Sequence, residues 1–134
     1  MGTDRAERQA RVGGWMVDTF GPMALETEER ALRLFEEAAE LAQACGVGQE
    51  KLLGLILHVY GKPAGEAAKE AGQVGVCLLA FCAATGVNAD AAEAAEVDRV
   101  TSLSADHFRD RQNAKAEKGL GGRAAPLPGS AGQR

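Results

Sequence analysis

The sequence contains little that builds a β-sheet. Aromatic residues make up only 4% of its 134 residues, although hydrophobic residues make up 46%, and alanine accounts for much of the difference. Alanine favours helices and close helix packing, and no stretch of alternating apolar and polar residues predicts a strand. We therefore expect an all-α protein with a single domain, since a chain of this length can bury one core but not two.

Cysteine is also rare, and neither a secretory signal nor a bilayer-length apolar run is present. The three cysteines lack Cys-x-x-Cys spacing and predict free core thiols: Cys45, Cys77 and Cys82. A net charge of −4 argues against binding to a nucleic-acid backbone. The charged N-terminus has no apolar segment, and the longest uncharged apolar run is about half a bilayer span. We expect a cytoplasmic protein that binds neither nucleic acid nor membrane.

Glycine, proline and capping residues divide the chain into five predicted helices. They span residues 3–19, 27–45, 49–60, 64–85 and a region after Asn88. The last region either continues to Lys118 or starts again at Ser104, a good N-cap residue. From Gly119 the composition changes to Gly, Ala, Pro and Ser without apolar periodicity. We expect a helical domain over residues 1–118 and a flexible tail, outside the core, over residues 119–134.

The predicted helix over residues 64–85 carries no charge from Val74 to Ala84. A helix that is apolar on all sides is surrounded by protein. The run therefore predicts either the central helix of a bundle or the interface of an oligomer. Trp15, the only tryptophan, is expected either in the core or an interface, or as a platform on which a nucleotide base stacks.

Acidic residues cluster on the helix predicted over residues 27–45. Glu36, Glu37 and Glu40 fall within about 100° of one another, largely opposite the apolar face. Carboxylates placed in this way repel one another. They form either a solvated acidic surface or the ligands of a hard cation such as Mg²⁺, which prefers carboxylate oxygens.

A further carboxylate, Glu70, lies at the start of the helix predicted over residues 64–85. It shares a helical face with Gln73 and with apolar residues, so we expect its side chain to point inward. Burying an unpaired carboxylate costs several kcal/mol. If Glu70 faces the acidic cluster, a cation between them would offset that cost, and the two stretches together predict a metal site.

These two stretches and their surroundings resemble the all-α nucleoside triphosphate pyrophosphohydrolases of the MazG and dimeric dUTPase type. The acids match the family's Glu-Glu-x-x-Glu, followed one helix later by Glu-x-x-Asp, in which Gln73 replaces the Asp. The frame also matches, with Trp-Met-x-x-x-Phe-Gly at 15–21, Glu-Arg-x-x-Arg-x-x-Glu-Glu at 29–37 and Val-Tyr-Gly-Lys-Pro-x-Gly-Glu at 59–66. The resemblance covers about residues 12–118 and points to the phage branch that includes the MazZ type.

The resemblance implies that Glu37, Glu40 and Glu70 bind Mg²⁺, for which Mn²⁺ can substitute. Gln73 can offer a carbonyl oxygen but no charge, which leaves the number of metals open. Glu36 is implied to be either the base for the attacking water or a group just behind the ligands.

The basic residues in the C-terminal part of the domain have two readings. They either complement the dipole of their helix or bind the outer phosphates of a nucleotide: Arg99, Arg109, Arg111, Lys115 and Lys118.

The implied reaction is hydrolysis of a (deoxy)nucleoside triphosphate between its α and β phosphates, giving the monophosphate and pyrophosphate. The resemblance further implies a homo-oligomer, dimer or tetramer, and a purine deoxynucleotide substrate, with dGTP first, in phage nucleotide metabolism in the host cytoplasm. The alternative is a non-catalytic helical interaction module in which the acids are a solvated face.

Overall fold

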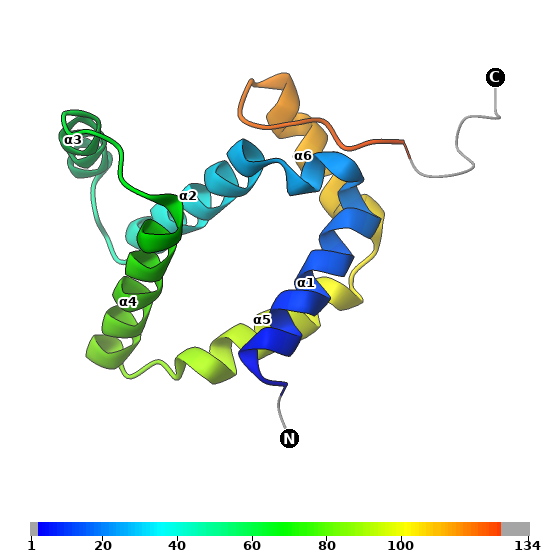
Figure 1. Cartoon of the computed structure of the whole chain (residues 1–134), viewed down its shortest axis with the longest axis horizontal. Coiled ribbons are helices and arrows are strands. Elements are labelled where there is room, and N and C mark those ends of the chain that lie inside the picture. Colours follow the sequence, from blue (N-terminus) through cyan, green and yellow to red (C-terminus); the bar gives the residue numbers. More distant parts are fainter. Residues whose placement is uncertain (1–2, 127–134) are drawn as a thin grey trace. The chain divides into compact units, whose positions relative to one another are not determined.

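The structure, a computed structural model, describes residues 3–126, and in that range it contains helices and no strand. The predicted all-α class is confirmed. The elements in chain order are α1 (Arg5–Phe20), a short 3-10 helix η1 (Pro22–Leu25), α2 (Thr27–Ala44), α3 (Gln49–Tyr60), α4 (Ala67–Thr85), α5 (Ala89–Ser102) and α6 (Ala105–Glu117) (Figure 1).

The described residues form six α-helices rather than the five predicted, because the last predicted helix is interrupted. Of the two alternatives for that region, the restart is correct: Ser104 has extended backbone and occupies the N-cap position of α6. The predicted cap at Asn88 is also confirmed, since its side-chain oxygen accepts a hydrogen bond from the N–H of Ala91 at 2.9 Å. Helix α4 begins at Ala67, three residues later than predicted.

The chain divides into two compact units. Among the described residues, the first unit comprises 3–36 and 94–126, and the second comprises 37–93. Helices α2 and α5 each run from one unit into the other. The two units are therefore described separately.

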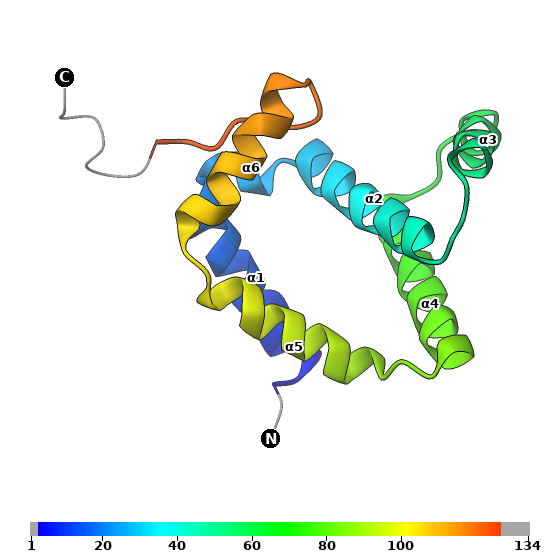
Figure 2. The ribbon, with the colours of Figure 1, turned by 180° about the vertical axis from the view of Figure 1, so that it is seen from behind.

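The first unit has a small aromatic core where α1 packs against α6 (Figure 2). Phe20 is buried there, and the ring of Trp15 meets it edge to face, with the ring centroids 5.7 Å apart. Trp15 makes a second edge-to-face contact with Phe108 at 5.1 Å. Such aromatic pairs contribute about 0.5–1.5 kcal/mol each beyond their burial. Trp15 is thus partly buried against the core, as one of its two predicted roles requires, and its role as a base-stacking platform stays a prediction.

The segment after α6 contradicts the prediction of a tail outside the core, as far as residue 126. Ala124 is buried against Phe20 and Ala24, and the N–H of Ala125 donates to the carbonyl of Phe20 at 3.0 Å. The prediction from composition was wrong because backbone hydrogen bonds can hold a segment that has no apolar periodicity. The remainder of the predicted tail, residues 127–134, lies outside the described residues.

Helices α3 and α4 of the second unit leave their apolar side chains exposed. No two helices of residues 37–93 pack along their lengths, and α4 exposes Val76 to 61% and Leu79 to 56%. The prediction that α4 is the central helix of a bundle is therefore wrong within one chain, and the oligomer interface remains as the alternative. Of the cysteines predicted to be in the core, only Cys82 is buried, and all three are free.

The sequence predicts no apolar run long enough to span a bilayer, and the length of α4 contradicts that prediction. As formed, its 19 residues are long and apolar enough to cross a membrane by length and composition, the one such helix among the described residues. The core helix of a soluble protein meets the same two criteria.

The aromatic core predicts a large effect of truncating Phe20. Phe20→Ala should lower the free energy of unfolding by about 3–5 kcal/mol, because it leaves a cavity and removes an aromatic pair. Leu25→Ala, at a side chain 63% exposed in the same unit, should cost no more than about 0.5 kcal/mol. Urea unfolding at one fixed protein concentration, followed by Trp15 fluorescence, measures both. Similar losses in the two variants would contradict this core.

Candidate active site

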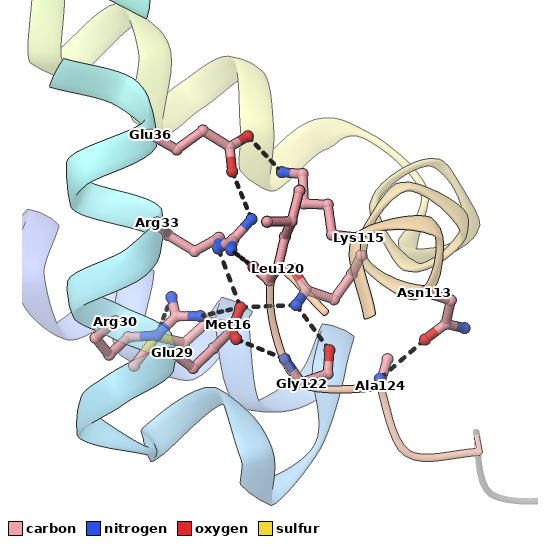
Figure 3. Close-up of polar contacts among 11 residues, drawn as sticks. Met16, Glu29, Arg30, Arg33, Glu36, Asn113, Lys115, Leu120, Gly122 and Ala124 are labelled. Carbon is pink, nitrogen blue, oxygen red and sulfur yellow. Dashed lines mark hydrogen bonds and ion pairs between the residues drawn. The ribbon is translucent and has the colours of Figure 1, made fainter. Parts of the chain in front are cut away.

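The acids of α2 fall into two groups that differ in their partners. Glu29 and Glu36 are held by ion pairs inside the first unit (Figure 3). Glu37 and Glu40, one turn apart in the second unit, are exposed, and neither makes an ion pair within the described residues. The acids predicted to bind metal are thus the unpaired ones.

Glu70 does not point inward as predicted. It is exposed, because α4 packs along no other helix of its unit and so has no inward face. Its carboxylate folds back over the preceding loop, so that a Cβ added at Gly65 would lie 2.5 Å from its Oε1 atom. Gln73 is exposed as well.

The predicted metal ligands do not form a complete site within one chain. Among the residues that the structure describes, no group of three or more His, Cys, Asp or Glu side chains could hold a metal. Glu37 and Glu40 alone provide a pair of free carboxylates with only oxygen donors. That donor set suits Mg²⁺, which is commonly held by one or two carboxylates together with substrate phosphates and water.

Glu29 is the buried end of a row of alternating charges. Its side chain is 3% exposed and accepts hydrogen bonds from Gln112 Nε2 at 2.7 Å and from the N–H of Gly122 at 2.8 Å. The Nε atom of Arg33 lies 3.2 Å from Glu29 Oε1, as an ion pair without hydrogen-bond geometry. Arg33 Nη1 then donates to Glu36 Oε2 at 2.5 Å.

Lys115 of α6 completes this row. Its Nζ atom lies 2.7 Å from Glu36 Oε1, so both carboxylate oxygens of Glu36 are in ion pairs. Partial burial raises the pKa of Glu36, but the hydrogen bond and charge of Lys115 and the charges of Arg33 and Arg111 outweigh it. The net result is a pKa below the ordinary value of a glutamate.

The other basic residues predicted to bind phosphate have varied surroundings. Arg99 forms a bidentate pair with Glu96 one turn away, at 2.8 and 3.0 Å. Arg109 donates to the carbonyls of Thr19, at 2.8 Å, and Ala125, and so supports the fold. Arg111 and Lys118 are exposed. Lys115 is the one that the structure brings directly to a predicted catalytic residue.

A depression of about 250 Å³ in the first unit lies beside the segment that follows α6. Its lining includes three carboxylates and three glycines: Glu26, Glu28, Glu29, Gly119, Gly121 and Gly122. Three carboxylates repel a phosphate group, so this depression is not suited to a triphosphate.

Sequence reasoning did not identify the roles of Glu29, Arg33 and Gln112. The spacing of Glu29 and Arg33, four residues apart on a helix, is a signal for an ion pair. No local pattern indicates Gln112, which reaches Glu29 across 83 positions of sequence.

Comparisons of this chain with protein-family models, with curated proteins and with solved structures gave no match.

The ion pairs of Glu36 predict a pH-dependent contribution to stability. Because the pKa of Glu36 is lower in the folded state than in the unfolded chain, its contribution to stability is present above the pKa of the unfolded chain. It is lost as the pH falls through the folded-state pKa. Glu36→Gln should therefore be less stable than the wild type by roughly 1 kcal/mol at neutral pH, and the difference should shrink near pH 3.

Urea unfolding of both proteins at the two pH values measures this difference. Lys115→Met serves as the matched variant, because it removes the other member of the same ion pair and should show the same trend. A difference between the wild type and Glu36→Gln that stays constant with pH would contradict the assigned pairing.

Proposed function

We propose that this protein is a metal-dependent (deoxy)nucleoside triphosphate pyrophosphohydrolase of the MazG-like type. The observation that carries the proposal is the division of the α2 acids. Glu37 and Glu40 are exposed and make no ion pair within the described chain, whereas the adjacent Glu36 is paired with Lys115. Like-charged carboxylates one turn apart on a helix destabilise it slightly, and a cation would offset that repulsion.

The roles of the residues follow from their chemistry. Glu37 and Glu40, with Glu70, would hold Mg²⁺, which when bound lowers the pKa of a water and neutralises phosphate charge. The carboxylate of Glu36 accepts the proton of the water that attacks the α-phosphorus. A new bond forms from the water oxygen to that phosphorus, and the bond to the α,β-bridging oxygen breaks, with its electron pair leaving on pyrophosphate. Lys115, with Arg111 and Lys118, binds the outer phosphates.

Assembly of copies is part of the proposal. Helices α3 and α4 expose large apolar side chains, including Leu57, Tyr60, Val76 and Leu79. Exposed apolar patches of this kind mark interaction surfaces. A second copy that covers them would bury the charge-free run of α4. We propose a homo-oligomer, dimer or tetramer, in which Glu70 and the carboxylates of α2 come together.

The second candidate function is a non-catalytic helical interaction module. Its support is that Glu37, Glu40 and Glu70 do not gather into one cluster in the described part of the chain, and that α3 and α4 expose apolar surface. The two candidates differ in their response to metal. Mg²⁺ or Mn²⁺ at millimolar concentration should raise the melting temperature of the enzyme, because a ligand that binds only the native state stabilises it. A solvated acidic face should respond weakly.

The enzyme proposal predicts that pyrophosphate and a nucleoside monophosphate are the products, and that dGTP is the best substrate. The assay is pyrophosphate release from each of the eight common ribo- and deoxyribonucleoside triphosphates with saturating Mg²⁺. Glu37→Gln, Glu40→Gln and Glu70→Gln should each lower kcat by about 10²–10³-fold. Glu28→Gln, an exposed acid in the first turn of the same helix, is the matched control and should remain active.

Wild-type turnover by Glu70→Gln would refute the proposed ligand set. A tenfold preference for dCTP or dUTP over dGTP would refute the purine assignment but leave the chemistry intact. Absence of pyrophosphate release from every nucleotide would refute the enzyme proposal.

The assembly proposal predicts a mass of two or four times 14.0 kDa by light scattering at micromolar concentration. Val76→Lys should shift the mass toward that of the single chain, because a charge would be buried in the interface. Gln9→Lys adds the same charge at an exposed position of α1 and should not change the mass. A wild-type monomer with full activity would contradict the proposal.

A further inference from the structure

The guanidinium group of Arg33 is held on three sides. Nε lies 3.2 Å from Glu29 Oε1, Nη1 donates to Glu36 Oε2 at 2.5 Å, and Nη2 donates to the carbonyl of Leu120 (Figure 3). A guanidinium is planar and its donors diverge in fixed directions. Nη1 and Nη2 donate to two different acceptors, and Nε lies within ion-pair distance of Glu29 without hydrogen-bond geometry, so the group cannot rotate without losing a contact. Arg33 thus fixes the position of Oε2 of Glu36.

Two of these three acceptors depend on the segment that follows α6. We name residues 119–125 the C-terminal strap. It supplies the carbonyl of Leu120 to Arg33, and the N–H of Gly122 to Glu29 at 2.8 Å. The carbonyl of Gly122 accepts a hydrogen bond from Gln112 Nε2 at 2.8 Å. The same nitrogen donates to Glu29, so the buried side-chain amide of Gln112 links the strap to Glu29.

The far end of the strap is anchored independently of Arg33. The N–H of Ala124 donates to Asn113 Oδ1 at 3.0 Å, and the N–H of Ala125 donates to the carbonyl of Phe20 at the same distance. Ala124 is buried in the aromatic core. These contacts keep the strap seated even though its sequence has no apolar periodicity.

At Gly121 the strap lies close to the side chains around Arg33. A Cβ added there would come within 2.9 Å of Glu29 Oε2, 3.0 Å of Gln112 Nε2 and 3.1 Å of Arg33 Nη2. These atoms are the ones that orient Arg33. Any side chain at position 121 would therefore push on the group that holds Glu36.

We propose that Arg33, held by the C-terminal strap, is the positioning residue for the Glu36 carboxylate, while Lys115 is its exchangeable partner. This inference rests on the proposed function of Glu36 as the base. Lys115 contacts only Oε1 of Glu36, and its ammonium group is carried on a flexible side chain. A bound triphosphate competes with the Glu36 carboxylate for the ammonium group of Lys115. When Lys115 turns to phosphate, Oε1 becomes free to accept a proton, and Arg33 still holds Oε2.

The test compares Arg33→Lys and Gly121→Ala with Gly13→Ala, in the full chain with saturating Mg²⁺. Gly13 lies in α1 of the same unit, and an added Cβ there meets nothing within 4 Å. Arg33→Lys and Gly121→Ala should lower kcat roughly 10–100-fold with little change in KM. Gly13→Ala should change neither quantity. Lys115→Met should mainly raise KM.

A second readout separates this inference from the proposed function. Crystal structures of the variants without nucleotide show where the Glu36 carboxylate lies. If Arg33→Lys and Gly121→Ala displace that carboxylate but no nucleotide is hydrolysed by the wild type, the strap controls Glu36 and the enzyme proposal is wrong. If the wild type is active and both variants keep its kcat and the position of the carboxylate, the positioning role is overturned. Retention of both would leave Arg33 and the strap a purely structural role.

Discussion

A carboxylate at the protein surface is hydrated, whereas a buried carboxylate must accept hydrogen bonds from donors of the protein. Glu29 is such a buried group, with only 3% of its side chain exposed. Gln112 and the N–H of Gly122 supply these donors, with Arg33 beside them. Leaving a buried charged group without its partners costs more than the 1–3 kcal/mol of a neutral one. Helix α6, helix α2 and the C-terminal strap are therefore tied together at Glu29, and the row of charges that ends at Lys115 is built outward from it.

The same helix carries acids that the fold does not use. Glu37 and Glu40 contribute no ion pair to the described structure, whereas Glu29 and Glu36 lie in the row of paired charges. This separation of structural from free carboxylates along α2 supports a binding role for the free pair. The second unit also leaves its apolar side chains exposed, and we propose that contact with another copy covers them. The function proposed above joins these two features.

Local signals predicted the local structure well. The Asn88 cap and the restart at Ser104 are set by neighbouring residues, and the apolar residues together with the stop at Gly61 identified α3 with the correct bounds. The predictions that were wrong concern features that depend on residues distant in the sequence. The strap is held by backbone groups and by Gln112, none of which has an apolar signature. The apolar neighbours of Glu70 on α4 predict its burial. Periodicity, however, shows only which face of a helix is apolar, and not whether the same chain provides a surface that covers this face. Roles for Glu37, Glu40 and Glu70 stay predictions.

We propose that the free acids of α2, Glu37 and Glu40, bind the metal, and that the paired ones do not. Electron paramagnetic resonance of Mn²⁺ measures free ion directly, and hence the bound fraction without reference to turnover. We expect the wild type to bind Mn²⁺, the double variant Glu37→Gln/Glu40→Gln to lose that binding, and Glu36→Gln to retain it. No binding by the wild type, or an equal loss in Glu36→Gln and the double variant, would contradict the account.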